Sequence, residues 1–73
     1  MPTFAERIKE LRAEHNLTQE QLGEVIGVKH YSIYSYGKGR SYPEMRGLVM
    51  LADYFGVSMD YLAGRTDRRE VNR

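Results

Sequence analysis

Residues 17–37 read LTQEQLGEVIGVKHYSIYSYG and contain the most informative pattern in the chain. Thr18 and Gln21 have the spacing of a capping box, in which the two residues bond each other's main-chain N–H groups at a helix start. The apolar residues that follow are Leu22, Val25 and Ile26. Gly27 can take the positive φ that often ends a helix. The stretch therefore predicts a helix that runs to about Ile26, a tight turn, and a second helix.

The segment after the turn predicts a short helix from Lys29 to about Tyr36 with two different sides. Ile33 and Tyr36 point inward, and the small Gly23 lets another backbone approach closely. The outer face has no aliphatic side chain and consists of Lys29, His30, Tyr31, Tyr34 and Ser35. An ordinary corner of two packed helices normally has a more apolar second helix. The polar outer face instead favours a helix that enters the major groove of DNA.

Further helices are predicted on both sides of this pair. Apolar stripes at helical spacing cover Phe4–Glu14 and Pro43–Phe55, and Ser58 caps a last short helix that contains Leu62. In the first helix the residues that face away from the apolar stripe are Glu6, Arg7, Lys9 and Glu10. Residues 66–73 are charged and almost free of apolar side chains, and we expect a disordered tail. No segment predicts a strand, so the chain is expected to form one all-α domain over residues 1–65.

Composition excludes several classes of protein. The chain has 73 residues, no cysteine and a formal net charge of +1, so disulfides and thiolate metal sites cannot stabilise it. Residues 29–46 contain four cations, Lys29, Lys38, Arg40 and Arg46, against Glu44 alone. This block is either a solvated surface or the side that faces nucleic acid. The N-terminus lacks a secretory signal pattern and no apolar stretch is long enough to span a bilayer, so we expect a soluble, cytoplasmic protein.

The order of the motifs resembles one known family. These motifs are Ile8-Lys9-Glu10-Leu11-Arg12, Leu17-Thr18-Gln19-Glu20-Gln21-Leu22, Ile26-Gly27-Val28, Ile33, Gly39-Arg40, Pro43, Leu51-Ala52, Gly56-Val57-Ser58 and Tyr61-Leu62. Over residues 4–64 they are similar to the Cro/phage-repressor (xenobiotic-response-element) helix-turn-helix family. The resemblance implies a five-helix, all-α fold whose second and third helices bind DNA, commonly as a dimer on a two-fold related operator.

The chain departs from the family pattern at two glycines. Gly23 stands where the family usually has alanine, and because the size is similar we expect only helix stability to suffer. Gly37 stands where the family usually has a glutamate that pairs with an arginine matching Arg12. Arg12 must then find another acceptor, such as a main-chain carbonyl, or turn to solvent. We predict a looser join between the first helix and the end of the third.

Two sets of residues are candidates for DNA contact. The candidates for reading bases are Lys29, His30, Tyr31, Tyr34 and Ser35, because rings, hydroxyls and amines can bond or pack on base edges. The candidates for phosphate contact are Thr18, Gln19, Lys38, Arg40, Ser41 and Tyr42. Thr18 and Gln19 lie at a helix start, which attracts anions, and the others lie in a loop whose glycines permit close backbone approach.

The sequence thus predicts a sequence-specific regulator of transcription that binds double-stranded DNA, with repression favoured and a homodimer expected on a palindromic operator. The alternative is a protein-interaction module of the same fold, such as an antitoxin or assembly partner. Exposed tyrosines keep this alternative open, since tyrosine is enriched at interfaces. Met45, Met50, Met59 and Tyr54 either line a dimer or partner surface or fill gaps in the core. No catalytic site, metal, cofactor, small-molecule ligand or membrane contact is expected.

Overall fold

The computed structural model describes residues 2–71 and contains five helices, with no strand in that range. The helices are α1 (Phe4–Glu14), α2 (Gln19–Ile26), α3 (His30–Gly37), α4 (Met45–Phe55) and α5 (Met59–Leu62). The prediction of an all-α, five-helix chain is confirmed. The largest difference in a helix boundary is at Pro43, which precedes α4 instead of forming its first turn, because Glu44 is the residue that caps this helix.

Side-chain caps fix where three of the helices begin. At α2, Thr18 Oγ1 accepts from Gln21 N at 3.0 Å and Gln21 Oε1 accepts from Thr18 N at 2.8 Å, as the capping-box pattern predicts. Thr3 and Glu6 form the same reciprocal pair at α1, although the prediction for α1 used only its apolar period. Ser58 Oγ accepts from Tyr61 N at 2.9 Å and starts α5, as expected.

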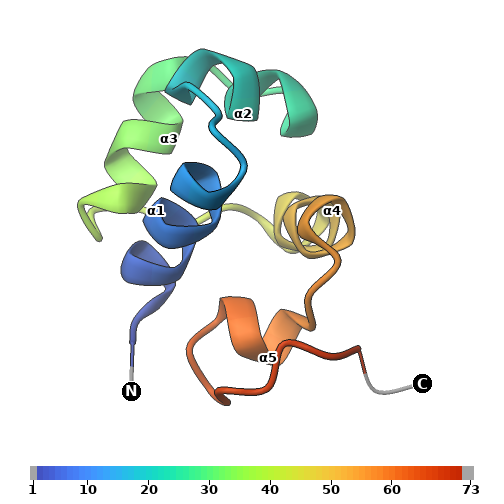
Figure 1. Ribbon diagram of the computed structural model, residues 1–73. Coiled ribbons are helices and arrows are strands. Elements are labelled where there is room, and N and C mark those ends of the chain that lie inside the picture. The colour runs from blue at the N-terminus through green and yellow to red at the C-terminus, as the bar shows by residue number, and fades with distance from the viewer. Residues whose placement is uncertain (1, 72–73) are drawn as a thin grey trace.

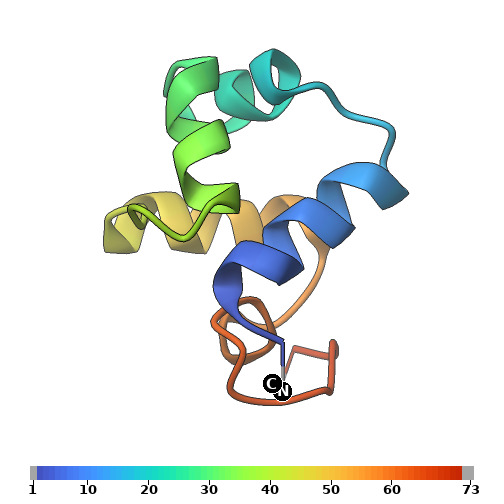
Figure 2. The same cartoon turned by 90° about the vertical axis from the view of Figure 1, so that its left-hand side faces the viewer.

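The helices pack in three levels (Figures 1 and 2). The α2–α3 pair lies at one end of the molecule, α5 lies at the other, and α1 and α4 lie between them. The buried apolar side chains are Phe4, Ile8, Leu11, Leu22, Ile26, Ile33, Tyr36, Leu51, Ala52, Phe55, Val57, Tyr61 and Leu62. One core therefore connects all five helices and holds α3 by its inner side. No helix between residues 2 and 71 is long and apolar enough to cross a membrane.

The joint between α2 and α3 is closed tightly at Gly23. Gly27 ends α2 with a φ of 74°, and Val28 N then donates to Gly23 O at 2.9 Å. A Cβ atom added at Gly23 would lie 2.5 Å from the main-chain oxygen of Val28. The predicted close approach is confirmed. The expectation that alanine would fit here and change only helix stability is wrong, because the obstructing atom belongs to the backbone.

The joint between α1 and α3 is open at Gly37. A Cβ atom added there would meet only the side chain of Lys9, with its Cγ at 3.2 Å. Arg12 Nη1 donates to the main-chain oxygen of Leu17 at 2.9 Å, which confirms the predicted carbonyl acceptor. In residues 2–71 no carboxylate pairs with Arg12. The looser join between α1 and α3 that the missing glutamate predicts stays a prediction.

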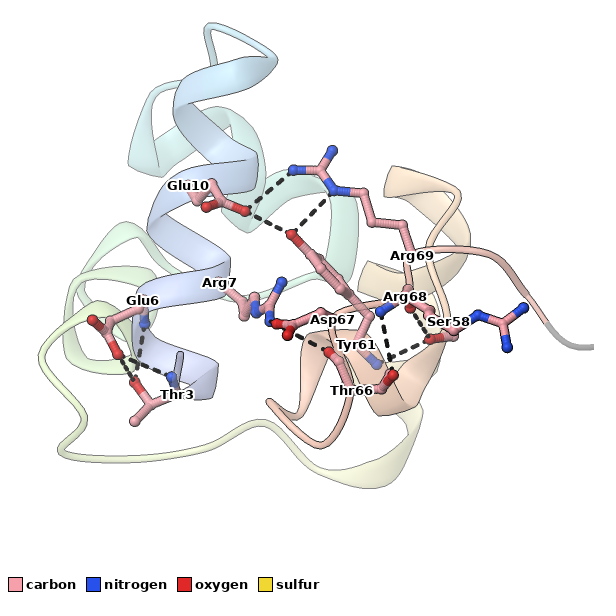
Figure 3. Close-up of polar contacts among 10 residues, drawn as sticks. All are labelled: Thr3, Glu6, Arg7, Glu10, Ser58, Tyr61, Thr66, Asp67, Arg68 and Arg69. Carbon is pink, nitrogen blue, oxygen red and sulfur yellow. Dashed lines mark hydrogen bonds and ion pairs between the residues drawn. The ribbon is translucent and has the colours of Figure 1, made fainter. Parts of the chain in front are cut away.

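Arg7 corrects one part of the α1 prediction. The apolar period places Arg7 on the solvent side of α1, but the residue is only 4% exposed. Its guanidinium carbon lies 3.8 Å from the centre of the Tyr61 ring, and Nη2 donates to Asp67 Oδ1 at 2.8 Å (Figure 3). The prediction is wrong because α5 and the residues after it cover a second side of α1, which the period of α1 alone cannot reveal.

Residues 66–71 have no regular secondary structure but pack against α1 and α5 (Figure 3). Arg69 Nη2 pairs with Glu14 Oε2 at 2.6 Å, and its Nε donates to Tyr61 Oη at 3.1 Å. We call the contacts of Asp67 and Arg69 with α1 and α5 the tail clasp. Asp67 and Arg69 thus make defined contacts with partners that lie more than fifty residues away in α1. The disorder of the tail as a whole stays a prediction. Residues 72–73 of the expected tail lie outside the described range.

Candidate nucleic-acid interface

The outer side of α3 presents exposed polar and aromatic side chains. Tyr31 is 63% exposed and Tyr34 45%, whereas Ile33 on the inner side is only 3% exposed. Lys29 precedes the helix and His30 begins it, and both are exposed. We call Lys29, His30, Tyr31 and Tyr34 the recognition face. The structure therefore brings together four of the five residues predicted to read bases.

Ser35, the fifth predicted base-reading residue, contacts its own chain. It is half-buried, and its Oγ lies 2.7 Å from Ser41 Oγ. The main-chain N–H of Arg40 also donates to Ser35 O at 3.0 Å. Ser35 is predicted to read bases and Ser41 to contact phosphates. In the structure these two side chains bond each other and hold the loop that follows α3.

The start of α2 lies beside the start of α3. A shallow depression is lined by Thr18, Gln19 and Glu20 from the α2 start and by His30. The Thr18 hydroxyl is already an acceptor for Gln21 N, whereas Gln19 is the first residue of the helix and is half-buried. The first N–H groups of a helix have no partner within the helix and attract anions. Two of the predicted phosphate residues are therefore adjacent to the recognition face.

The loop after α3 separates the remaining phosphate candidates. Lys38 and Arg40 are exposed, and Lys38 Nζ lies 5.5 Å from the centre of the Tyr34 ring, so this amine borders the recognition face. Tyr42 is 69% exposed, but its ring centre lies 5.7 Å from that of Phe4 at the start of α1. The loop thus brings Lys38 to the edge of α3 and packs Tyr42 on α1.

Two cations from α1 were not predicted to lie near this surface. A solvent-open hollow of about 220 Å³ lies between α1 and α3, and Lys9 and Arg12 line it together with Gln19 and Lys38. The sequence pattern places Lys9 on the solvent side and gives Arg12 either another acceptor, such as a main-chain carbonyl, or a position in solvent. No local signal could identify them, because their position depends on how α1 crosses α3.

The chain was compared with known proteins by sequence. The helix-turn-helix family model matches residues 8–62. The chain is 41% identical over 64 residues to the uncharacterized HTH-type transcriptional regulator YobD of Bacillus subtilis (strain 168). The aligned region covers 88% of this chain and 57% of that protein. It is 38% identical over 60 residues to the cryptic phage CTXphi transcriptional repressor RstR of Vibrio cholerae. That aligned region covers 82% of this chain and 54% of the repressor. The chain thus spans about half the length of these two curated relatives.

Solved structures share the arrangement of the helices. The P22 c2 repressor in complex with synthetic operator 9T superposes with a TM-score of 0.83 at 26% identity, covering 90% of this chain and 100% of that one. A transcriptional regulator from Listeria innocua superposes with a TM-score of 0.84 at 34% identity, covering 88% of this chain and 60% of that one. The matched family model spans α2, α3 and the joint between them. The chain therefore belongs to the helix-turn-helix family, of the Cro and phage-repressor type.

Proposed function

We propose that this chain is a sequence-specific regulator of transcription that binds double-stranded DNA with α3 in the major groove, and that it acts as a repressor. The observation that carries the proposal is the division of α3 into two sides. Ile33 and Tyr36 hold the helix in the core, while the recognition face remains exposed. An α-helix fits the major groove, where each base pair presents a distinct pattern of donors, acceptors and methyl groups.

The surroundings of α3 support a backbone contact on each side of the helix. Gln19 at the α2 start and Lys38 after α3 flank the recognition face and are proposed to bind phosphates. Such contacts position a protein on the duplex without reading its sequence. The proposal gains support from the relatives, which are named transcriptional regulators and repressors, and from the P22 c2 repressor, which was solved with a synthetic operator. A regulator of this kind would act in the cytoplasm.

We further propose that two copies bind a two-fold symmetric operator. The eight residues of α3 reach too few base pairs for high specificity, and a dimer doubles the contact. Half-sites in such complexes lie about 34 Å apart. Met45 is 69% exposed and Tyr54 45%, so both are accessible to a second copy, whereas Met50 and Met59 pack against the core. The same exposed residues favour the second candidate function, a module that binds a partner protein.

The test is selection of duplexes from a random pool, followed by fluorescence anisotropy with the recovered site. His30→Ala and Tyr31→Ala should each cost about 1–3 kcal/mol in binding and relax preference at one base pair. Asp53→Ala, an exposed change on α4, is the control and should leave binding unchanged. Affinity should fall steeply between about 50 and 200 mM salt. Unchanged affinity and preference in both α3 variants, or no bound duplex at low salt, would contradict the proposal.

A further inference from the structure

The hollow beside Gly37 has the form of a small, open-sided pocket. Its apolar lining residues are Ile8 and Ile33, which are 1% and 3% exposed and belong to the core. Its volume is about 220 Å³. Since a water molecule occupies about 30 Å³ in the liquid, the hollow has room for a tetrahedral oxyanion of five heavy atoms. No side chain of α3 fills this space, because the residue that faces it is a glycine.

The charges around the hollow are all of one sign. Lys9, Arg12 and Lys38 line it, and no aspartate or glutamate is among its lining residues. Arg12 uses one Nη for the Leu17 carbonyl, and a guanidinium carries five N–H donors, so donors remain for a second acceptor. Three cations around one space repel one another unless an anion lies between them.

The acids of α1 are held elsewhere. Glu6 bonds Thr3 at the start of the helix, and Glu10 bonds Arg69 in the tail clasp (Figure 3). Glu14 also bonds Arg69. The carboxylates of α1 therefore bond Thr3 and the tail, whereas two of its cations, Lys9 and Arg12, border the hollow. Within residues 2–71 none of these acids forms an ion pair with Lys9 or Arg12.

We propose that the hollow accepts a phosphate group of the DNA backbone, bound by Lys9, Arg12 and Lys38. This proposal rests on the proposed function. DNA is favoured over a free phosphate ion because the hollow is continuous with the DNA-facing surface: Gln19 and Tyr34 also line it. A phosphate there would lie beside α3 while the Tyr34 side of the helix faces the groove. Charge-assisted bonds from a guanidinium and ammonium groups are the usual means of holding such an oxyanion.

The test places a carboxylate in the hollow. Gly37→Glu adds an acid between Lys9 and Arg12, and Gly37→Gln adds a side chain of the same shape without charge. The chain offers room for both, because the new Cβ would meet only the flexible side chain of Lys9. Binding of the full chain to the selected duplex is measured by anisotropy over a range of salt concentrations. Ala13→Glu, on the exposed part of α1, controls for the change in net charge.

Gly37→Glu should bind roughly tenfold more weakly than Gly37→Gln, the loss of about one charge-assisted bond. The slope of log affinity against log salt should fall by about one for Gly37→Glu only. Thermal unfolding should show Gly37→Glu at least as stable as Gly37→Gln, since the carboxylate gains Arg12 as a partner. Equal affinity and slope in these two variants, with His30→Ala still impaired, would overturn the pocket and leave the proposed function standing.

A second pair of variants removes a cation instead. Lys9→Gln should lower the salt slope by about one, whereas Arg65→Gln, an exposed cation after α5, should not. Titration of inorganic phosphate followed by NMR separates the two sources of the oxyanion. Saturating shifts at Gly37 without any binding of duplexes would overturn both the DNA ligand and the proposed function. Equal slopes for Lys9→Gln and Arg65→Gln would overturn the pocket alone.

Discussion

The α2–α3 joint and the α1–α3 joint each contain a glycine at a helical position, Gly23 and Gly37, and the two joints differ in packing. At Gly23 the main chain of Val28 occupies the place of a side chain, so the helices touch backbone to backbone. At Gly37 a side chain would meet only the flexible side chain of Lys9, and Lys9, Arg12 and Lys38 line the hollow beside it. A glycine in a helix can therefore indicate either a close contact or a missing side chain, and only the neighbouring atoms distinguish the two.

The largest expected effect is that of Gly23→Ala. Alanine improves helix propensity by up to about 1 kcal/mol, but forcing an atom into a packed joint costs about 1–3 kcal/mol. We expect a net loss of about 1–2 kcal/mol in the free energy of unfolding, because the Val28 carbonyl can move only if the turn at Gly27 also moves. Urea denaturation measures this change. A stability gain equal to the propensity difference would show that the joint is not closed.

The next largest expected effect is that of a substitution at Arg12. Arg12→Met keeps the length of the side chain but removes the donor to Leu17 O, and should destabilise the chain by about 1 kcal/mol. In the Gly37→Glu background the same change should cost more, because a carboxylate partner is lost as well. A double-mutant cycle in urea measures the difference. If the coupling between positions 12 and 37 is zero, the hollow does not bring these side chains together.

Gly37→Ala should have a smaller effect, opposite in sign to that of Gly23→Ala. The new Cβ meets only Lys9 Cγ at 3.2 Å, and this flexible side chain can shift. We expect a gain of about 0.5 kcal/mol from helix propensity alone. The same urea series checks it. Destabilisation by this variant would mean that both joints are closed, and the contrast between them would disappear.

The smallest expected effect is a change in how the free energy of unfolding depends on pH under acidic conditions. The hydrogen bond from Arg69 lowers the pKa of Glu14 below its ordinary value of 4.5. A lowered folded-state pKa contributes stability that is complete above 4.5 and is lost as the pH falls through the folded value. Arg69→Gln should therefore bring the pKa of Glu14 back toward 4.5 and flatten the loss of stability below that pH.

Glu6 provides the internal control for that titration. Its pKa is lowered chiefly by the hydrogen bond from the main-chain N–H of Thr3, and Arg69 has no part in it. NMR titration of both carboxylates should show Glu14 moving in Arg69→Gln while Glu6 stays in place. A shift of both would mean that the substitution disturbs α1 as a whole and does not act through the tail clasp.

Local patterns were sufficient for the helices and for the recognition face. The capping box at Thr18 and the spacing of Leu22, Ile26 and Ile33 fix the α2–α3 pair without reference to the rest of the chain. Gly23 was correctly predicted to mark a close approach, but the tightness of the joint depends on the exact path of Val28. The period of a helix and the residues of a turn are both local features of the sequence. The helices and turns of this chain could therefore be predicted almost completely.

Contacts between distant segments were beyond local patterns. Arg7 is buried because Tyr61 and Asp67 cover it, and Lys9 borders a hollow because α1 crosses α3 near Gly37. Such positions depend on the packing of elements far apart in the chain, and a period of 3.6 residues does not encode them. The contacts of Asp67 and Arg69 in the charged tail were beyond local patterns for the same reason, since their partners lie in α1.

The tail clasp has a consequence for where this domain can be cut or joined to another protein. The family match ends at residue 62, a natural place to truncate, yet Asp67 and Arg69 lie beyond it. A fragment that stops there would lose both acceptors of the Arg7 guanidinium, the Thr66 carbonyl and the Asp67 carboxylate. Fusions should therefore retain residues up to 71. They would then extend from the end of the molecule opposite α3 (Figures 1 and 2), where a reporter does not obstruct the recognition face.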